Sequence, residues 1–188
     1  MQIKPPGRRV LFLSRDTGSL QATIPVIQAL ALKGGYYLYV VCMQDEHVLD
    51  PIKGIVSVSF DKAAFSRHPE VYLEKLLNES DANLVVSGSS PAKGAPPETP
   101  EQYLIRVARN RGIQSLAILD CWWLYLERFA NINGDLDDTL IPDVICVMDK
   151  IAKEDLVSLG INAEKLYITH NPWLDQIANH VLEPCKEI

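Results

Sequence analysis

The chain has 188 residues, of which 47% are hydrophobic and 22% charged, and a formal net charge of −6. This length suits one well-buried domain, and no apolar run approaches the roughly 20 residues that a membrane span needs. The acidic balance argues against general nucleic-acid binding, which requires a basic surface. We therefore expect one cytoplasmic domain over residues 1–188, in which residues 183–188 begin an inter-domain linker or form a free tail.

The first half of the chain alternates short apolar segments with helical patterns. Strands are predicted over residues 9–14, 36–42, 55–60 and 83–87, and one helix over residues 69–78. Another helix is predicted after residue 19, where Pro25 is tolerated if it lies in the first turn. The apolar side of that helix is expected to contain Ala22, Val26, Ala29, Leu30 and Leu32.

A long loop and a well-marked helix start follow. Residues 88–97 (GSSPAKGAPP) are too rich in glycine and proline for regular structure. The sequence Thr99-Pro100-Glu101-Gln102 has the spacing of a capping box, with proline at the first helical position. We predict a helix from there to residue 111, a strand over residues 113–119, and an aromatic-rich segment over residues 120–129.

Residues 142–175 predict a strand, a helix, a second strand over residues 165–169 and the start of another helix. The apolar run from Val144 to Met148 suits a parallel strand that is covered on both faces. Asp149 fits the helix N-cap and Pro172 the first turn of the last helix. The whole pattern indicates an α/β fold with a doubly wound, Rossmann-like, mostly parallel sheet of about seven strands.

In sheets of this kind, ligands bind outside the carboxyl ends of the strands. Four polar segments are expected at those ends and should share one rim; they are residues 16–19, 87–93, 120–123 and 170–171. The turn after the first strand has a single glycine, so the dinucleotide fingerprint G-x-G-x-x-G is absent, and we expect no cofactor.

The cysteines do not indicate a metal site. Cys42, Cys121, Cys146 and Cys185 show no spacing typical of metal ligands, and three of them lie in or just after apolar segments. Buried, reduced thiols of a cytosolic protein are a better interpretation than disulfides or a zinc site.

The last third of the chain also carries a resemblance. The residues "PDVICVMDKIAKEDLVSLGI…KLYITHNPWLD" resemble the end of the N-terminal domain of GT-B-fold enzymes. That superfamily includes nucleotide-sugar glycosyltransferases and the non-hydrolysing UDP-GlcNAc 2-epimerases. The resemblance implies a GT-B N-terminal half that holds a sugar acceptor, is inactive alone, and needs a C-terminal or separate nucleotide-sugar-binding domain.

Glycosyl transfer needs a base for the acceptor hydroxyl and electrostatic support for the leaving diphosphate. The first turn, where many members of the superfamily carry a histidine, holds Asp16, Thr17, Gly18 and Ser19 here. Asp16 is the candidate base, and the other three are candidate substrate-binding residues. The alternative for Asp16 is a cap of the turn or helix.

Two further catalytic candidates follow later strands. Asp120 could orient a hydroxyl or a histidine, or could cap a helix that contains Trp122. His170, next to the expected hinge, could act as an acid or as a donor to phosphate, or could be a surface or capping histidine.

The remaining substrate-binding candidates lie in the other polar segments and in the aromatic segment: Ser89, Ser90, Trp122, Trp123, Arg128 and Asn171. The tryptophan pair could form a platform for a sugar ring, part of the core, or a surface for a partner. Arg128 could bind a phosphate through two hydrogen bonds or could be solvated.

Three hypotheses result for the function. The first is the acceptor-side domain of a GT-B glycosyltransferase-like protein. The second is a non-catalytic scaffold domain that docks or forms homo-oligomers through Trp122 and Trp123. The third is half of a nucleotide-sugar epimerase, in which Asp16, Asp120 and His170 act as acid and base.

Overall fold

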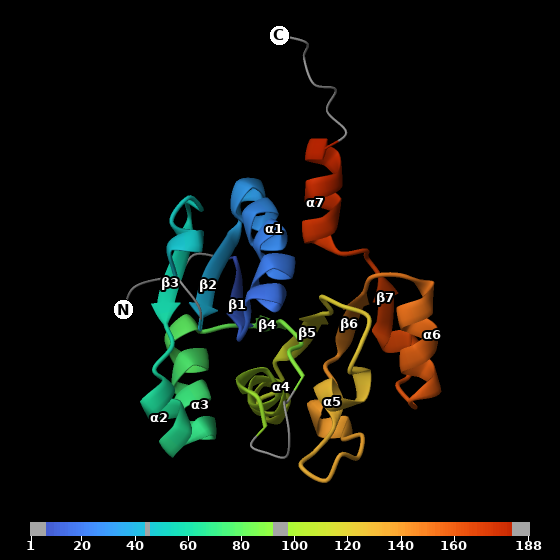
Figure 1. Ribbon diagram of the computed structural model, residues 1–188. Coiled ribbons are helices and arrows are strands. Elements are labelled where there is room, and N and C mark those ends of the chain that lie inside the picture. The colour runs from blue at the N-terminus through green and yellow to red at the C-terminus, as the bar shows by residue number, and fades with distance from the viewer. Residues whose placement is uncertain (1–6, 44–45, 92–97, 182–188) are drawn as a thin grey trace, which may run out of the picture.

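A computed structural model describes residues 7–43, 46–91 and 98–181 of the chain (Figure 1). Seven strands form one sheet in the order β3-β2-β1-β4-β5-β6-β7, and every pair of neighbours is parallel. This confirms the predicted doubly wound α/β fold. The expected linker or tail at residues 183–188, Cys185 and residues 92–97 of the long loop lie outside the described residues.

The predicted strands all form, with ends that agree to within one residue. They are β1 (Arg8–Ser14), β2 (Tyr36–Cys42), β3 (Ile55–Ser59), β4 (Leu84–Ser87), β5 (Gln114–Ile118), β6 (Val144–Val147) and β7 (Leu166–Ile168).

The helices between them are α1 (Thr17–Lys33), α2 (Lys62–Arg67), α3 (Pro69–Ser80), α4 (Pro100–Asn110), α5 (Tyr125–Phe129), α6 (Lys150–Ser158) and α7 (Pro172–Val181). Short 3-10 turns occur at η1 (Glu46–Leu49), η2 (Asp138–Leu140) and η3 (Ala163–Lys165). Helix α2 was not predicted. No helix in the described ranges is both long and apolar enough to cross a membrane.

The capping residues that the sequence predicts are confirmed. The Thr99 hydroxyl accepts from the Gln102 amide at 3.2 Å, while the Gln102 side chain accepts from the Thr99 amide at 2.8 Å. Asp149 accepts from the Ala152 amide at 2.8 Å and so starts α6. Each side chain satisfies an amide that has no partner within its helix.

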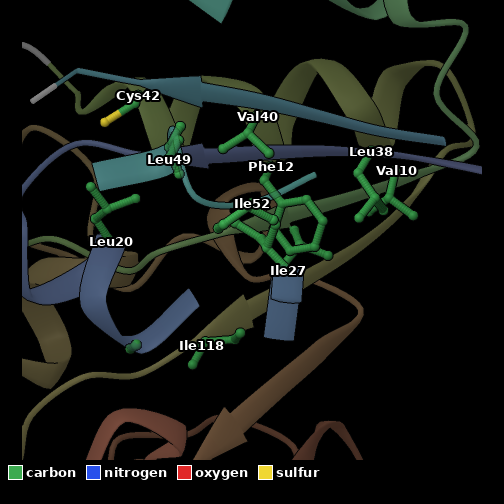
Figure 2. Packing of buried hydrophobic residues seen from close by; sticks show 12 residues of the cluster. Val10, Phe12, Leu20, Ile27, Leu38, Val40, Cys42, Leu49, Ile52 and Ile118 are labelled. Atoms are coloured by element: carbon green, nitrogen blue, oxygen red, sulfur yellow. The ribbon is translucent and has the colours of Figure 1, made fainter. Parts of the chain in front are cut away.

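Different helices cover the two faces of the sheet. On one face, Phe12 of β1 packs with Ile27 of α1, as Figure 2 shows. On the other face, Leu13 of β1 packs with Leu77 of α3 and Leu104 of α4. Because successive strand residues point to opposite faces, the apolar run in β1 is buried on both sides.

The prediction for α1 is wrong in two respects. Ala22 is buried, and Val26 and Leu30 pack against the core as predicted. Ala29 is exposed and Leu32 is 89% exposed, so these two residues do not face the sheet. Pro25 lies inside the helix, because the helix begins at Thr17, well before the first-turn position that was expected. The spacing of apolar residues identifies only part of the buried face, because two of the buried side chains carry hydroxyl groups. The buried residues of α1 are Ser19, Leu20, Ala22, Thr23 and Ile27.

Helix α7 lies beside α1, although the two are far apart in the sequence (Figure 1). The Gln176 side-chain amide donates to the Gln28 side-chain oxygen at 3.4 Å. This contact holds α7 against α1, so that the polar turn before α7 lies close to the sheet.

Candidate functional site

The register of the sheet brings several strand ends to one level. Leu13 of β1 pairs with Ser87 of β4, which in turn pairs with Ala117 of β5. Ile118 of β5 pairs with Cys146 of β6. Because these strands are parallel, the polar residues after them share one edge of the sheet. We call residues 16–19, 87–91, 120–123 and 170–171 the strand-end rim; hydrogen bonds described below join these four segments, as predicted.

Two glycines allow the loops of the rim to approach each other. A Cβ atom on Gly18 would lie 2.5 Å from Asp120 Oδ2, which is closer than real Cβ atoms come to a neighbour. A Cβ atom on Gly88 would overlap the side chain of Ser19. The loop after β1 can therefore contact the loops after β4 and β5 only because both positions lack a side chain.

Asp16 and Asp120 flank the same point on the rim. The position of a Gly18 Cβ would be 3.7 Å from Asp16 Oδ1 and 2.5 Å from Asp120 Oδ2. Asp16 Oδ1 also accepts from the Ser19 amide at 2.9 Å and so caps α1. Partial burial alone would raise the pKa of Asp16, but hydrogen bonds from Ser19 and Ser90 outweigh it and the pKa is lowered. Asp16 is therefore ionised at neutral pH.

A buried arginine lies beneath Asp120. Arg128 is 2% exposed, and its Nη1 donates to Asp120 Oδ1 at 3.0 Å, to the Ser89 hydroxyl at 2.9 Å and to the Ser89 carbonyl. Its Nε donates to the Trp123 carbonyl at 3.3 Å, and its Nη2 to Cys121 Sγ at 2.6 Å. The alternative of a solvated arginine is wrong. Arg128 holds the loops after β4 and β5 together, and a phosphate would have to displace these partners.

The polar turn after β7 joins the rim through Asn171. Its Nδ2 donates to the Asp120 carbonyl at 3.1 Å, and its Oδ1 accepts from the Trp173 amide at 3.0 Å at the start of α7. His170 is exposed and has a φ of 60°. A left-handed backbone is unusual for a residue other than glycine, and such residues are concentrated at functional sites.

The tryptophan pair lies in a loop and is exposed. Trp122 is 50% and Trp123 68% exposed, so the interpretation of both as core residues is wrong. The interpretation of Asp120 as the cap of a helix that contains Trp122 is also wrong, since α5 begins at Tyr125. The physical reason is Leu124, whose φ of 54° interrupts any helix at this point.

Trp122 is anchored at one end only. Its Nε1 donates to Asp149 Oδ2 at 2.7 Å. A hydrogen bond from the Ala152 amide, and then the one from Trp122, lower the pKa of Asp149; the charge of His170 has a smaller effect in the same direction. Because the polar atom of the indole already has a partner, what remains for a ligand or a partner protein is the face of the ring.

Sequence reasoning missed Glu101 as a site residue. Glu101 is 2% exposed, and its Oε1 accepts from the Arg15 amide at 2.8 Å, while Arg15 Nη2 donates to the Pro91 carbonyl at 2.6 Å. Burial raises the pKa of Glu101 to about 7. A signal existed in the helix period: Glu101 precedes the buried Leu104 and Ile105 by three and four residues, which places it on the buried side of α4.

Several solved structures share this fold. MnaA of S. aureus, solved with UDP, matches with a TM-score of 0.66 and 13% identity over 91% of this chain and 46% of that chain. The UDP-GlcNAc 2-epimerase of Methanocaldococcus jannaschii matches with a TM-score of 0.59 and 18% identity, over 88% of this chain and 46% of that one. MurG of Acinetobacter baumannii matches with a TM-score of 0.59 and 13% identity, over 87% and 45%. The chain has the fold of one half of a GT-B protein.

The chain spans about half the length of the solved structures that it matches. No family model and no curated protein matches the sequence. The structural matches therefore confirm the GT-B-type fold that the sequence resemblance implied. Their coverage is consistent with an N-terminal half.

The polar side chains of the strand-end rim differ in how accessible they are to a ligand. Among the residues that the structure describes, no group of three or more histidine, cysteine or acidic side chains could hold a metal ion. Cys42, Cys121 and Cys146 are free thiols, but only Cys42 is buried as predicted; Cys121 and Cys146 are partly exposed. Ser19, Ser89, Ser90 and Asn171 are buried and hydrogen-bonded within the protein. Asp16 and Asp120 are partly exposed, so these two carboxylates are the rim groups that a ligand with hydroxyl groups can reach.

Proposed function

We propose that this chain is the acceptor-side half of a GT-B glycosyltransferase-like protein, completed by a nucleotide-sugar-binding domain. The observation that carries the proposal is the convergence of Asp16 and Asp120 on Gly18, at the carboxyl ends of parallel strands. A pair of carboxylates at such a position can accept a proton from a hydroxyl group and hold its neighbours in place.

The charge of the rim favours a sugar hydroxyl over a diphosphate. The lowered pKa of Asp16 keeps this carboxylate negative. The positive charge of Arg128 lies beneath the rim and is shared between Asp120 and Ser89. An anionic diphosphate would be repelled here, whereas a hydroxyl group can donate to either carboxylate. The nucleotide-sugar is accordingly assigned to the second domain.

Asp120 is better placed than Asp16 to act as the base. Arg128 binds Asp120 Oδ1, which leaves Oδ2 on the side of Gly18. Asp16 is committed to the Ser19 amide and receives a further hydrogen bond from Ser90, so it suits orientation of the acceptor. His170 is exposed and precedes Asn171, which binds the Asp120 carbonyl, and it is the candidate acid.

The test combines this chain with candidate nucleotide-sugar domains, or uses a longer chain that contains both, and measures UDP release and sugar transfer from UDP-sugars. Asp120→Asn is expected to lower kcat at least about 100-fold, the lower end of what a general base contributes, with little change in the KM for the donor. The matched control is Asp135→Asn, at an exposed acidic residue outside the rim.

Absence of turnover in every pairing, with folded protein, would refute the transferase. Equal activity of Asp120→Asn and Asp135→Asn would refute the role of Asp120. If the UDP-sugar instead takes up solvent deuterium at a sugar carbon, the chain is half of an epimerase, in which Asp16, Asp120 and His170 supply acid and base.

A second candidate function, docking to a partner or to a second copy, is favoured by the exposure of the tryptophan loop. Trp122, Trp123 and Leu124 are 50%, 68% and 44% exposed. Replacement of both tryptophans by serine should then change the oligomeric state in light scattering while the far-UV spectrum stays the same. A monomer before and after the change would remove this candidate.

A further inference from the structure

We propose that Glu101 is a positioning residue of the strand-end rim. Its carboxylate holds the loop after β1 against the loop after β4, and this contact weakens when Glu101 takes up a proton. The proposal deepens the proposed function, and rests on it only in that these loops carry Asp16 and Ser90 of the acceptor site. It concerns the orientation of the rim and not the chemical step.

The first support is the position of the carboxylate. Glu101 lies in the first turn of α4 and is 2% exposed. Its Oε1 accepts from the Arg15 amide at 2.8 Å, and its Oε2 lies 3.9 Å from Arg15 Nε. Arg15 directly precedes Asp16, so the hydrogen bond to Glu101 fixes the position of the backbone next to Asp16.

The second support is the link to the neighbouring loop. Arg15 Nη2 donates to the Pro91 carbonyl at 2.6 Å, and the Ser90 hydroxyl donates to Ser19 Oγ at 3.5 Å. The Ser90 hydroxyl also acts on both carboxylates, and it lowers the pKa of Asp16 as well as that of Glu101.

The charged surroundings of Glu101 are simple. Arg15 faces it from the loop after β1 and Ser90 from the loop after β4. On its own helix, Arg106 pairs with Glu98 at 2.5 Å and is occupied by that partner. Burial is the largest effect on Glu101 and raises its pKa to about 7, against the smaller opposing effects of Arg15 and Ser90.

Protonation therefore changes what Glu101 does near neutral pH. The ionised carboxylate accepts from the Arg15 amide and attracts the Arg15 guanidinium. The protonated group is itself a donor and no longer attracts that charge, which weakens the hold on the loop that carries Asp16. The arrangement of the acceptor site is thereby linked to the proton on a buried residue.

The experiment follows backbone amide shifts of the ¹⁵N-labelled chain between pH 5 and 9, in a His170→Gln background that removes the rim histidine as a second source of shifts. We expect the Arg15 amide to titrate with a midpoint near 7, and the Ser19 and Ser90 amides to follow the same midpoint. Glu101→Gln should abolish this titration at all three amides. Glu98→Gln, the matched control on a carboxylate paired with Arg106, should leave it intact.

Three results would overturn the proposal: an Arg15 amide that does not titrate, a titration that persists in Glu101→Gln, or an Arg15 titration that Ser19 and Ser90 do not share. If Glu101→Gln fails to fold, the ¹³C carboxyl shift of Glu101 in the unaltered chain gives the midpoint directly. No second domain is needed, so the outcome is independent of the transferase assay.

Discussion

Replacement of Arg128 by methionine tests whether the buried arginine holds the rim together. Methionine has a similar length, so the change mainly removes the charge and the donors that bind Ser89, Asp120 and Trp123. Loss of one partner from a buried ion pair typically costs about 3–5 kcal/mol, because the other charge is left without compensation. We expect the unfolding free energy to fall by roughly this amount.

The assay is urea unfolding. With an m-value of about 2 kcal/mol/M, the expected loss lowers the midpoint by roughly 2 M. The control is Lys150→Met, which breaks an exposed pair with Glu154 at 3.3 Å and should cost no more than about 0.5 kcal/mol. The double variant Arg128→Met/Asp120→Asn should recover part of the loss. An Arg128→Met midpoint equal to that of Lys150→Met would refute the reasoning.

Three further changes have definite expected signs. Gly18→Ala should destabilise the protein by about 1–2 kcal/mol in thermal unfolding, because its methyl group meets Asp120, yet it should be neutral or stabilising in an Asp120→Ala background. Thr99→Ala should cost about 1 kcal/mol in urea unfolding, since it removes the acceptor for the Gln102 amide. Burial raises the pKa of Glu101 from 4.5 to about 7. The folded state therefore binds this proton more tightly than the unfolded state does, and the unfolding free energy should fall by roughly 3 kcal/mol as the pH rises from about 4.5 to about 7. Glu101→Gln should remove that dependence; an unchanged pH profile would contradict the assignment.

The fold could be predicted because its signals are local. Short apolar runs such as residues 144–148 mark buried strands, and the Thr99 capping box marks a helix start within a few residues of sequence. The rim followed from topology alone, because parallel strands bring their carboxyl ends to one edge. The buried face of α1 was predicted only in part, because Ser19 and Thr23, which are polar by type, are buried against the sheet while Ala29 and Leu32 are exposed.

The arrangement within the rim could not be predicted, because it depends on residues far apart in the sequence. Arg128 is buried by Ser89, 39 residues away, and Glu101 by Arg15, 86 residues away. Leu124 gives no sign in its residue type of the left-handed backbone that excludes the tryptophans from a helix. Whether a charged side chain is buried thus depends on its partners, and these partners are brought together only in the tertiary structure.

These two buried charges have complementary effects on the rim. Arg128 binds the loop after β4 to the loop after β5, and Glu101 binds the loop after β1 to the loop after β4 through Arg15. Both charges lie below the surface, so the loops are oriented before any ligand arrives, and little reorganisation is left for the binding step. Burial of an ionised Glu101 lowers stability, and this cost is consistent with a role in orienting the site. Under the proposed function, a second domain would then only have to bring the donor sugar to the acceptor hydroxyl held beside Asp120 Oδ2.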